Sequence, residues 1–332
     1  MRKYPAATAL VAPILILTCF VAGAKTNVSP ANAGEGPPVL WSDPGDIGSR
    51  DLFYGAGGPQ HQPVGPFVFD KEESDGTQPK FQLLDANGVR WGAKMGLEAR
   101  PETAAARLLW AVGYFANDDY YLPTMPVQNL PHLDRGSNYV HGGVVHDVRL
   151  KRHSPDQIKL GIWEWASCPF VHTREWNGLR VMMALMNNWD LKDVNNSIFQ
   201  VKGASPELKY LVADLGSSFG PTSLSASLKG NLRAYRESKW IRAVNQNYVD
   251  FNVPSAPGGA YLIAFPIAIG RLSLDWVGRH IPRADARWLG DLLDRLSPRQ
   301  IHDAFRAAGY SADEVEGFSE IVESRIHELQ RM

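Results

Sequence analysis

Three short stretches between residues 67 and 94 are rich in apolar and aromatic residues and are bounded by polar or turn-forming segments. The stretches 67–70, 80–85 and 89–94 have the length and composition that are typical of β-strands. A polar loop, residues 71–78, separates the first two stretches, and the run Asp85-Ala-Asn-Gly88 has the composition of a tight turn. The pattern therefore predicts a meander of three strands.

Two longer stretches repeat apolar residues at helical spacing. From Pro101 to Tyr114 the apolar positions 105, 108, 109 and 112 fall on one side of a helix, and a proline suits its first turn. Residues 176–187 predict a second, more apolar helix. Shorter apolar runs predict a strand pair within 139–150 and two further strands near 199–201 and 210–213.

After residue 220 the pattern becomes mostly helical. Ser297-Pro298 is a favourable helix start, and Ser311 followed by Glu314 is the sequence signature of a capping box. We find no repeat of 20–50 residues in the sequence. Residues 284–330 are therefore expected to form amphipathic helices that either complete the C-terminal lobe or dock a partner.

The order of these elements predicts an α+β fold. Strands come first and helices follow, which indicates a β-rich N-terminal lobe over residues 66–135 and a mostly helical C-terminal lobe over residues 136–332. Residues 25–65 are rich in Gly, Pro, Ser and Asn and predict an irregular linker or wrap. A chain of 332 residues is long enough for one large domain or for two lobes.

The first 24 residues have the composition of a secretory signal peptide. Arg2 and Lys3 precede an uncharged apolar run, residues 6–21, and Ala22-Gly-Ala24 offers small residues to a peptidase. The run approaches spanning length, so an uncleaved membrane anchor is the alternative. Cleavage would leave Cys168 as the single cysteine, so the mature chain could form no intrachain disulfide.

The composition of the chain gives no support for two classes of partner, nucleic acids and anionic membranes. The chain is 44% hydrophobic and 21% charged, with a formal net charge of −1. This balance gives no electrostatic reason to expect binding to nucleic acid or to an anionic membrane. The chemistry must therefore be sought in particular residues.

The strongest chemical pattern is Asp190-Leu-Lys192-x-x-Asn195, followed by Asp214-Leu-Gly216. Phosphoryl transfer needs one carboxylate near the attacking hydroxyl, together with an asparagine and a second aspartate that hold Mg²⁺ against the phosphates. Asp and Asn taken singly are common in turns. Taken together, after an apolar helix and directly after a predicted strand, they predict a nucleotide site.

A second pair belongs to the same chemistry. In a kinase-like fold, a lysine on the third strand holds the phosphates and a glutamate on the next helix orients it. Lys94 ends the third predicted strand and Glu102 falls in the first turn of the following helix, with Glu98 as the alternative partner. An isolated pair of this kind is usually a surface salt bridge, but here it lies between the meander and the Asp190 segment.

Four motifs resemble those of known kinases. Residues 76–80, Gly-Thr-Gln-Pro-Lys, resemble the G-x-Q-x-K phosphate loop of HipA-type kinases, and residues 102–113 resemble the glutamate helix of that group. Asn188-x-Asp190 resembles the N-x-D sequence shared by HipA-type, phosphatidylinositol-type and secretory-pathway (Golgi casein kinase type) kinases. Residues 214–220, Asp-Leu-Gly-Ser-Ser-Phe-Gly, are similar to the metal-site segment of the secretory kinases. The resemblance covers residues 66 to 220 and implies an exported, two-lobed, protein-kinase-like enzyme.

The resemblance implies a nucleotide site for ATP. The backbone of Gly76, Thr77 and Gln78, with Lys80 at the end of the same loop, would surround the phosphates, as glycine-containing turns commonly do. Lys94 would contact the phosphates and Glu102 would orient it.

The resemblance also assigns the catalytic and metal-binding residues. Asp190 would accept or steer the substrate hydroxyl, and Lys192 would neutralise charge on the γ-phosphoryl group. Asn195 and Asp214 would bind Mg²⁺ through oxygen atoms, with Asn196 as a poorer substitute for Asn195. The acceptor would be a hydroxyl group on a protein, a sugar or a small molecule.

The chain departs from ordinary protein kinases in three places. Asn188-Trp189 stands where a His-Arg pair precedes the catalytic aspartate, no G-x-G-x-x-G loop precedes Lys94, and no A-P-E motif follows Asp214. Two alternatives therefore stay open: transfer of AMP on the same fold, and a catalytically inactive protein that binds a nucleotide or a partner.

Three other clusters have simpler explanations. His141, His146, Asp147 and His153 could suggest zinc, but the Gly142-Gly143 turn favours a plain hairpin. Cys168 near His172 could suggest a thiol nucleophile, but no third member is evident and a buried structural cysteine is expected. The tryptophans at 163, 165 and 176 could stack a ligand, yet we expect them to pack in the core.

Overall fold

The computed structural model describes residues 34–332 except 75, 77, 204–205, 223–227 and 254–273. The expected signal peptide and Thr77 lie outside the described residues. The described part is one compact unit that begins at Gly34. Among its residues, no helix is both long enough and apolar enough to cross a membrane.

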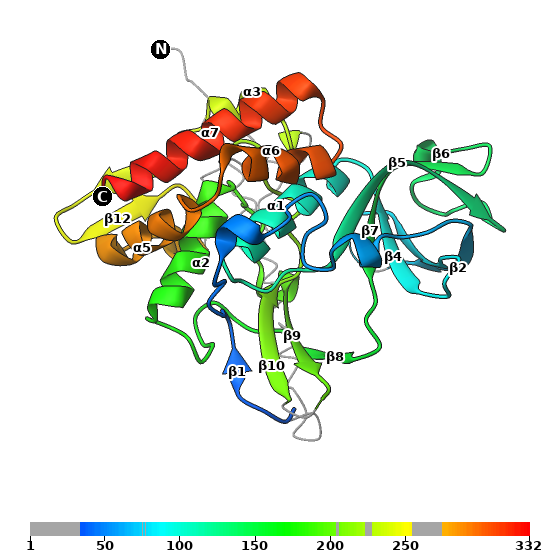
Figure 1. Ribbon diagram of the computed structural model, residues 1–332, viewed down its shortest axis with the longest axis horizontal. Coiled ribbons are helices and arrows are strands. Elements are labelled where there is room, and N and C mark those ends of the chain that lie inside the picture. The colour runs from blue at the N-terminus through cyan, green and yellow to red at the C-terminus, as the bar shows by residue number, and fades with distance from the viewer. Residues whose placement is uncertain (1–33, 75, 77, 204–205, 223–227, 254–273) are drawn as a thin grey trace, which may run out of the picture. The chain divides into compact units, whose positions relative to one another are not determined.

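A six-stranded sheet forms the first part of the fold (Figure 1). Its strands are β2 (Phe67–Glu73), β3 (Lys80–Leu84), β4 (Arg90–Met95), β5 (Asp119–Gln128), β6 (Val140–His141) and β7 (Val144–Arg152). The strand order is β4-β3-β2-β5-β7-β6, and β4 also pairs with β7. Five of the strands therefore close into a ring.

The expected three-strand meander is confirmed. Strands β2, β3 and β4 pair antiparallel in sequence order. The turn between β3 and β4 is organised by Asp85, whose Oδ1 accepts hydrogen bonds from the backbone amides of Asn87 and Val89 and whose Oδ2 accepts one from Trp91 Nε1. This carboxylate therefore accepts hydrogen bonds from the backbone of the turn and also holds the side chain of Trp91, the first buried residue of β4.

The interior of the ring holds its own hydrophobic cluster. In β3 and β4 every second residue contributes to it, because side chains alternate between the two faces of a strand. Its largest fully buried members include Phe81 and Trp91. The opposite face of β4 carries Gly92 and Lys94, so the polar side chains of this strand point away from the cluster.

Helix α1 (Ala99–Ala111) follows β4 and packs against β5 and β7. The expected helix over 101–114 is therefore present, beginning two residues earlier. The expected hairpin around Gly142-Gly143 is also present as β6 and β7.

A boundary between lobes at residues 135 and 136 would cut this sheet. Strand β7 pairs with both β4 and β5, so the sheet continues to Arg152. The β4–β7 pairing joins residues that are more than 50 positions apart in the chain, so local sequence patterns do not encode it.

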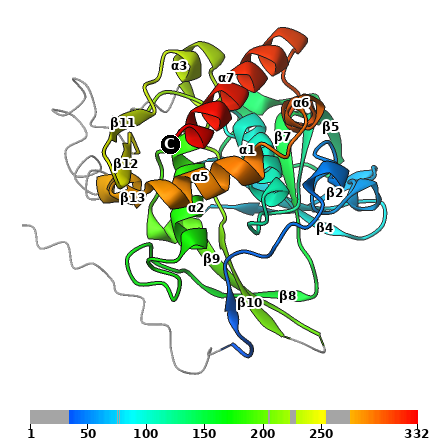
Figure 2. The same ribbon diagram turned by 60° about the vertical axis from the view of Figure 1, so that its left-hand side comes forward.

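A second sheet has the order β1-β10-β9-β8. Its strands are β1 (Pro38–Val39), β8 (Gln157–Gly161), β9 (Asn196–Val201) and β10 (Glu207–Val212). Figure 2 shows β1, from the segment expected to be irregular, beside β10. The rest of that segment contains two short 3-10 turns, η2 (Ile47–Ser49) and η3 (Pro59–His61).

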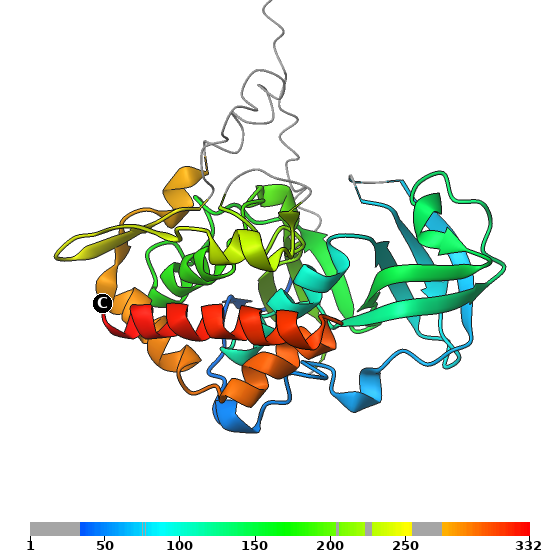
Figure 3. The same ribbon diagram turned by 90° about the horizontal axis from the view of Figure 1, so that it is seen from above.

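Helices form most of the remaining part of the fold. Those among the described residues are α2 (Arg174–Leu185), α3 (Leu232–Arg236), α5 (Arg283–Leu293), α6 (Pro298–Ala307) and α7 (Ala312–Gln330). Figure 3 shows α5, α6 and α7 on one side of the unit and the six-stranded sheet on the other. Helix α7 packs on α5, α6 and α3, and α6 reaches α1.

The helix starts expected at Ser297 and Ser311 are confirmed, and both are complete capping boxes. Not all of the chain after residue 220 is helical, however. Strands β11 (Ile241–Val244), β12 (Tyr248–Phe251) and β13 (Ile281–Pro282) form a small third sheet. The sequence pattern missed it because these strands are only two to four residues long.

The tryptophan and cysteine expectations are confirmed. Trp163, Trp165 and Trp176 are buried in the larger hydrophobic cluster, and so is the free Cys168. The rings of His141 and His146 lie 5.4 Å apart, within the β6–β7 hairpin. Among the described residues, no group with metal-binding geometry contains a histidine.

Candidate functional site

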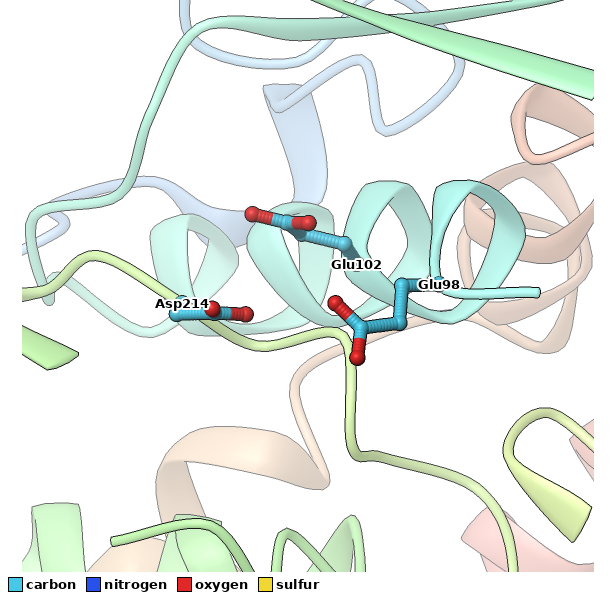
Figure 4. A group of neighbouring side chains, drawn as sticks. All are labelled: Glu98, Glu102 and Asp214. Atoms are coloured by element: carbon cyan, nitrogen blue, oxygen red, sulfur yellow. The ribbon is translucent and has the colours of Figure 1, made fainter. Parts of the chain in front are cut away.

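The centre of the site is the ammonium group of Lys94. Its Nζ lies 2.6 Å from Glu98 Oε2, 2.9 Å from Glu102 Oε2 and 3.0 Å from Asp214 Oδ1. Figure 4 shows the three carboxylates converging from the first turn of α1 and from the segment after β10. The structure therefore unites Lys94, its two candidate glutamates and an aspartate 120 positions further along the chain.

Strand periodicity explains why Lys94 points into this centre. The side chains of its neighbours Ala93 and Met95 point to the opposite face of the strand, and Ala93 lies in the interior cluster of the ring. The lysine therefore projects from the outer face towards α1. Glu98 directly precedes that helix with helical backbone angles, and Glu102 lies one turn later, so both reach the same ammonium group.

Burial and the neighbouring charges shift the pKa of Lys94 in opposite directions. Burial lowers the pKa of Lys94, but the three surrounding carboxylates raise it above its ordinary value. The side chain is 9% exposed, and the Glu102 side chain 1%. This lysine is therefore fixed and charged, as a residue that holds phosphate groups must be.

The network continues into the sheet through Arg149. Its Nη2 donates to Glu102 Oε1 at 2.7 Å, and its Nη1 lies 3.5 Å from Asp119 Oδ1. Burial acts to lower the pKa of Arg149, but Asp119 and Glu102 raise it. Sequence reasoning missed this pair, because only the β5–β7 and β4–β7 pairings bring the two strands beside Lys94.

Asp214 is charged and accessible. Burial would raise the pKa of Asp214, but Lys94 and the amide of Gly216 lower it to about 2. Both of these groups contact the same carboxylate oxygen, Oδ1. The side chain is enclosed by charged neighbours yet keeps 42% of its accessible surface, so a ligand can reach it.

Gly216 is required by close packing. A Cβ atom at this position would lie 2.6 Å from Glu98 Cβ and 2.7 Å from Glu98 Oε2. Those distances are too short for any side chain, because Glu98 is fixed by Lys94. The glycine of the Asp-Leu-Gly motif therefore lets the glutamate approach the centre.

The segment 190–195 is locked by its own hydrogen bonds. Asn188 Oδ1 accepts from the Asp190 amide at 3.1 Å, and Asn195 Nδ2 donates to the Asp190 carbonyl at 2.7 Å. The Asn195 carbonyl accepts from the amides of Ala213 and Asp214. The segment thus lies directly beside Asp214, and the Lys192 ammonium lies 3.3 Å from Asp190 Oδ2.

The loop at residues 76–80 lies beside Lys94 through strand register. Lys80 is the cross-strand partner of Lys94. Its ammonium pairs with Glu73 at 3.4 Å and not with the carboxylates of the centre. Gly76 adopts φ +74, and its carbonyl accepts from Arg135 Nη1 at 2.6 Å. No contact of Gln78 links it to the centre among the described residues.

The contacts of Asn196 and Glu98 indicate the role of each of these two secondary candidates. Asn196 is buried and its Nδ2 donates to the Trp163 carbonyl at 3.0 Å, so it serves the core and not the site. Glu98, considered only as an alternative to Glu102, contacts Lys94 as well and also pairs with Lys229. Lys229 lies over the ring of Trp189, 5.2 Å from its centroid, and had no sequence signal.

The donor set fits a hard divalent cation. Carboxylate oxygens of Glu98, Glu102 and Asp214 lie within 4.8 Å of one another, but the Lys94 ammonium occupies the space between them. A metal ion would instead be held by Asp214 with the amide oxygen of Asn195, whose amide nitrogen is engaged with Asp190. Oxygen donors of this type are the ones that Mg²⁺ prefers.

Comparison with known proteins adds little to this geometry. No protein-family model matches the sequence, and no curated protein matches it. The fold is similar to a proinflammatory kinase, CtkA, of Helicobacter pylori, at 11% identity and a TM-score of 0.35 over 76% of this chain and 93% of that one. It is also similar to the Golgi casein kinase, at 13% identity and a TM-score of 0.31 over 80% of this chain and 74% of that one. The assignment of function therefore depends on the site itself.

Proposed function

We propose that this chain is a two-lobed, kinase-like enzyme that transfers a phosphoryl group from Mg²⁺-bound ATP to a hydroxyl acceptor. One observation carries the proposal: a strand lysine meets a helix glutamate and a distant aspartate at one point, at 2.9 and 3.0 Å. That combination is the ion pair and metal-ligand arrangement that ATP-dependent phosphoryl transfer uses. A surface salt bridge would not be buried to this degree.

The binding residues follow from their positions. Lys94 would hold phosphate oxygens, kept in place by Glu102 and Glu98. The backbone of Gly76, Thr77 and Gln78, with Lys80, would surround the outer phosphates. This assignment of the loop is supported by the register that sets Lys80 opposite Lys94.

The reacting groups would lie on the segment beside Asp214. Mg²⁺, held by Asn195 and Asp214, would neutralise charge on the phosphates. Asp190 would orient the acceptor hydroxyl and take its proton as the oxygen bonds to the γ-phosphorus. The bond from that phosphorus to the bridging oxygen then breaks, and Lys192 would stabilise the charge that develops.

The proposal includes export through the signal-like residues 1–24, with a hydroxyl group on a protein, sugar or small molecule as acceptor. The basic start, apolar run and Ala-Gly-Ala ending support it. We expect the chain recovered from outside the producing cell to begin at Lys25, as measured by its intact mass. Recovery of only the uncleaved chain, in the membrane fraction, would favour the anchor.

Radiolabelled ATP tests the reaction. With Mg²⁺, the purified chain from Lys25 is expected to transfer label from γ-labelled ATP to an acceptor or to itself. Addition of EDTA should remove the activity, because the phosphates then lack their counterion. Label from α-labelled ATP would instead indicate AMP transfer. Nucleotide binding with neither label transferred would identify an inactive nucleotide-binding protein.

A further inference from the structure

A cavity of about 510 Å³ lies next to the Lys94 centre but contains none of its residues. Four parts of the chain line it: the N-terminal segment around Arg50, the connection from α1 to β5, the end of β7, and one face of the second sheet. The volume is in the range of sites for small organic ligands. Nothing in the proposed phosphoryl transfer uses this cavity.

The floor of the cavity is a row of side chains across three strands. Lys209 on β10 is paired with Phe199 on β9, and Phe199 is paired with Lys159 on β8. Directly paired residues of antiparallel strands point to the same face. The floor therefore presents an aromatic ring between two lysine positions, and the Lys209 ammonium lies over a second ring of the cavity, that of Phe115, 4.8 Å from its centroid.

The walls add further positive charge. Arg50, Lys151 and Arg152 line the cavity, so it contains five lysine and arginine side chains in total. Asp118, the acidic residue among the described residues that line the cavity, is paired with His61 at 2.8 Å. The cavity therefore has a large excess of positive charge in a chain with a formal net charge of −1.

Lys151 is the most informative of these residues. It stands on β7 opposite Gly92 and Asp119, and burial together with the nearby Arg149 lowers its pKa. Its side chain is partly buried and makes no hydrogen bond and no ion pair to any described residue. Lys159 makes none either, but it is exposed. For the partly buried Lys151 the lack of a hydrogen-bond acceptor is costly, and an anion in the cavity would supply one.

We propose that this cavity binds a phosphate ester of about the size of a nucleoside phosphate, at a site separate from the Lys94 centre. The phosphate would contact Lys151, Lys159 and Lys209, and a flat ring would stack on Phe199. Charge-assisted hydrogen bonds to phosphate and stacking on an aromatic ring are both favourable. The proposal does not depend on the chain being an active enzyme.

The cavity also touches the segment that leads to the centre. Asn117, which lines the cavity, donates from Nδ2 to the Ala213 carbonyl at 2.9 Å. Lys151 follows Arg149 by two positions on β7, so the two side chains lie on the same face of the strand. A ligand in the cavity would therefore contact Asn117, which is hydrogen-bonded to the residue before Asp214, and Lys151, which neighbours Arg149 on one face of β7.

Calorimetric titration with AMP in EDTA tests the proposal. We expect wild-type protein to bind AMP, with adenosine and inorganic phosphate each binding more weakly. Lys159→Gln and Lys209→Gln should each weaken AMP binding about tenfold or more, because a charge-assisted contact is lost. Lys202→Gln, an exposed lysine outside the cavity, is the matched control and should bind as the wild type does.

Asp214→Asn separates this site from the proposed ATP site. Unchanged AMP affinity in that variant, together with the losses in the lysine variants, is the expected result. Equal weakening by Asp214→Asn and Lys209→Gln would overturn the separate site, because the cavity would then receive part of the nucleotide held at Lys94. Absence of AMP binding, or binding that neither lysine variant weakens, would also overturn the proposal. Inorganic phosphate binding as tightly as AMP would overturn the assigned size.

Discussion

Asp214→Asn is expected to lower Mg²⁺-dependent transfer of label from ATP by at least about a hundredfold, since removing one group that stabilises charge in the transition state commonly costs about 10²–10³ in kcat. The pKa of Asp214 is about 2, so the wild-type carboxylate is ionised at every pH suited to the assay. The amide keeps the size of the side chain but loses the charge that a divalent ion requires. Initial rates at several Mg²⁺ concentrations measure the effect.

The matched control is Asp291→Asn. Asp291 is an exposed residue of α5, far along the chain from the site. This variant makes the same chemical change and should keep wild-type activity. Full activity in Asp214→Asn, with normal folding, would show that Asp214 does not hold the metal ion and would remove the main support for the proposed reaction.

Lys94→Met is expected to have the largest effect on stability. It leaves three carboxylates facing one another without the cation that holds them together. Removal of one partner from a buried ion network costs about 3–5 kcal/mol, which corresponds to a fall in Tm of roughly 10 °C for a chain of this size. Thermal unfolding at pH 7, followed by circular dichroism, measures the change.

The pH dependence separates this explanation from a simple packing defect. In the wild type, the lowered pKa of Asp214 stabilises the fold above the ordinary value of 3.8, and this contribution is lost as the pH falls towards about 2. In Lys94→Met, mutual repulsion raises the carboxylate pKa values, so protonation relieves the repulsion at mildly acidic pH. The Tm difference between the two proteins should therefore shrink from pH 7 to pH 4.

Lys80→Met is the control for this prediction. Lys80 lies opposite Lys94 on the next strand, but its single ion pair, with Glu73, is partly exposed. Its replacement should cost less than about 1 kcal/mol. A Tm difference for Lys94→Met that is equally small, or that does not change with pH, would contradict the proposed role of the carboxylate cluster.

Local patterns were sufficient for the elements that carry the site. Short apolar runs between turn signals predicted β2, β3 and β4, helical spacing predicted α1 and α2, and helices begin at the expected starts Ser297 and Ser311. These features depend on residues close in the chain. The motifs that contain Lys94, Glu102 and Asp214 are also short, so the sequence was enough to select these three residues as candidates.

Other parts of the site could not be read from the chain. Arg149 is one of several polar residues of β7 and Asp119 is the first residue of β5, and only the β4–β7 and β5–β7 pairings place them beside Glu102. Lys229 reaches Glu98 from 131 positions away. The short strands β11, β12 and β13 were missed because each depends on its partners more than on its own sequence.

The sequence by itself determined which residue types are available for phosphoryl-transfer chemistry and which local elements carry them, because strand alternation, helix spacing and caps act over a few residues. Only the tertiary structure decided that Lys94 is shared by three carboxylates and that a positively charged cavity lies beside them. Both features arise from contacts between segments far apart in the chain, and such contacts are fixed by the packing of the whole fold.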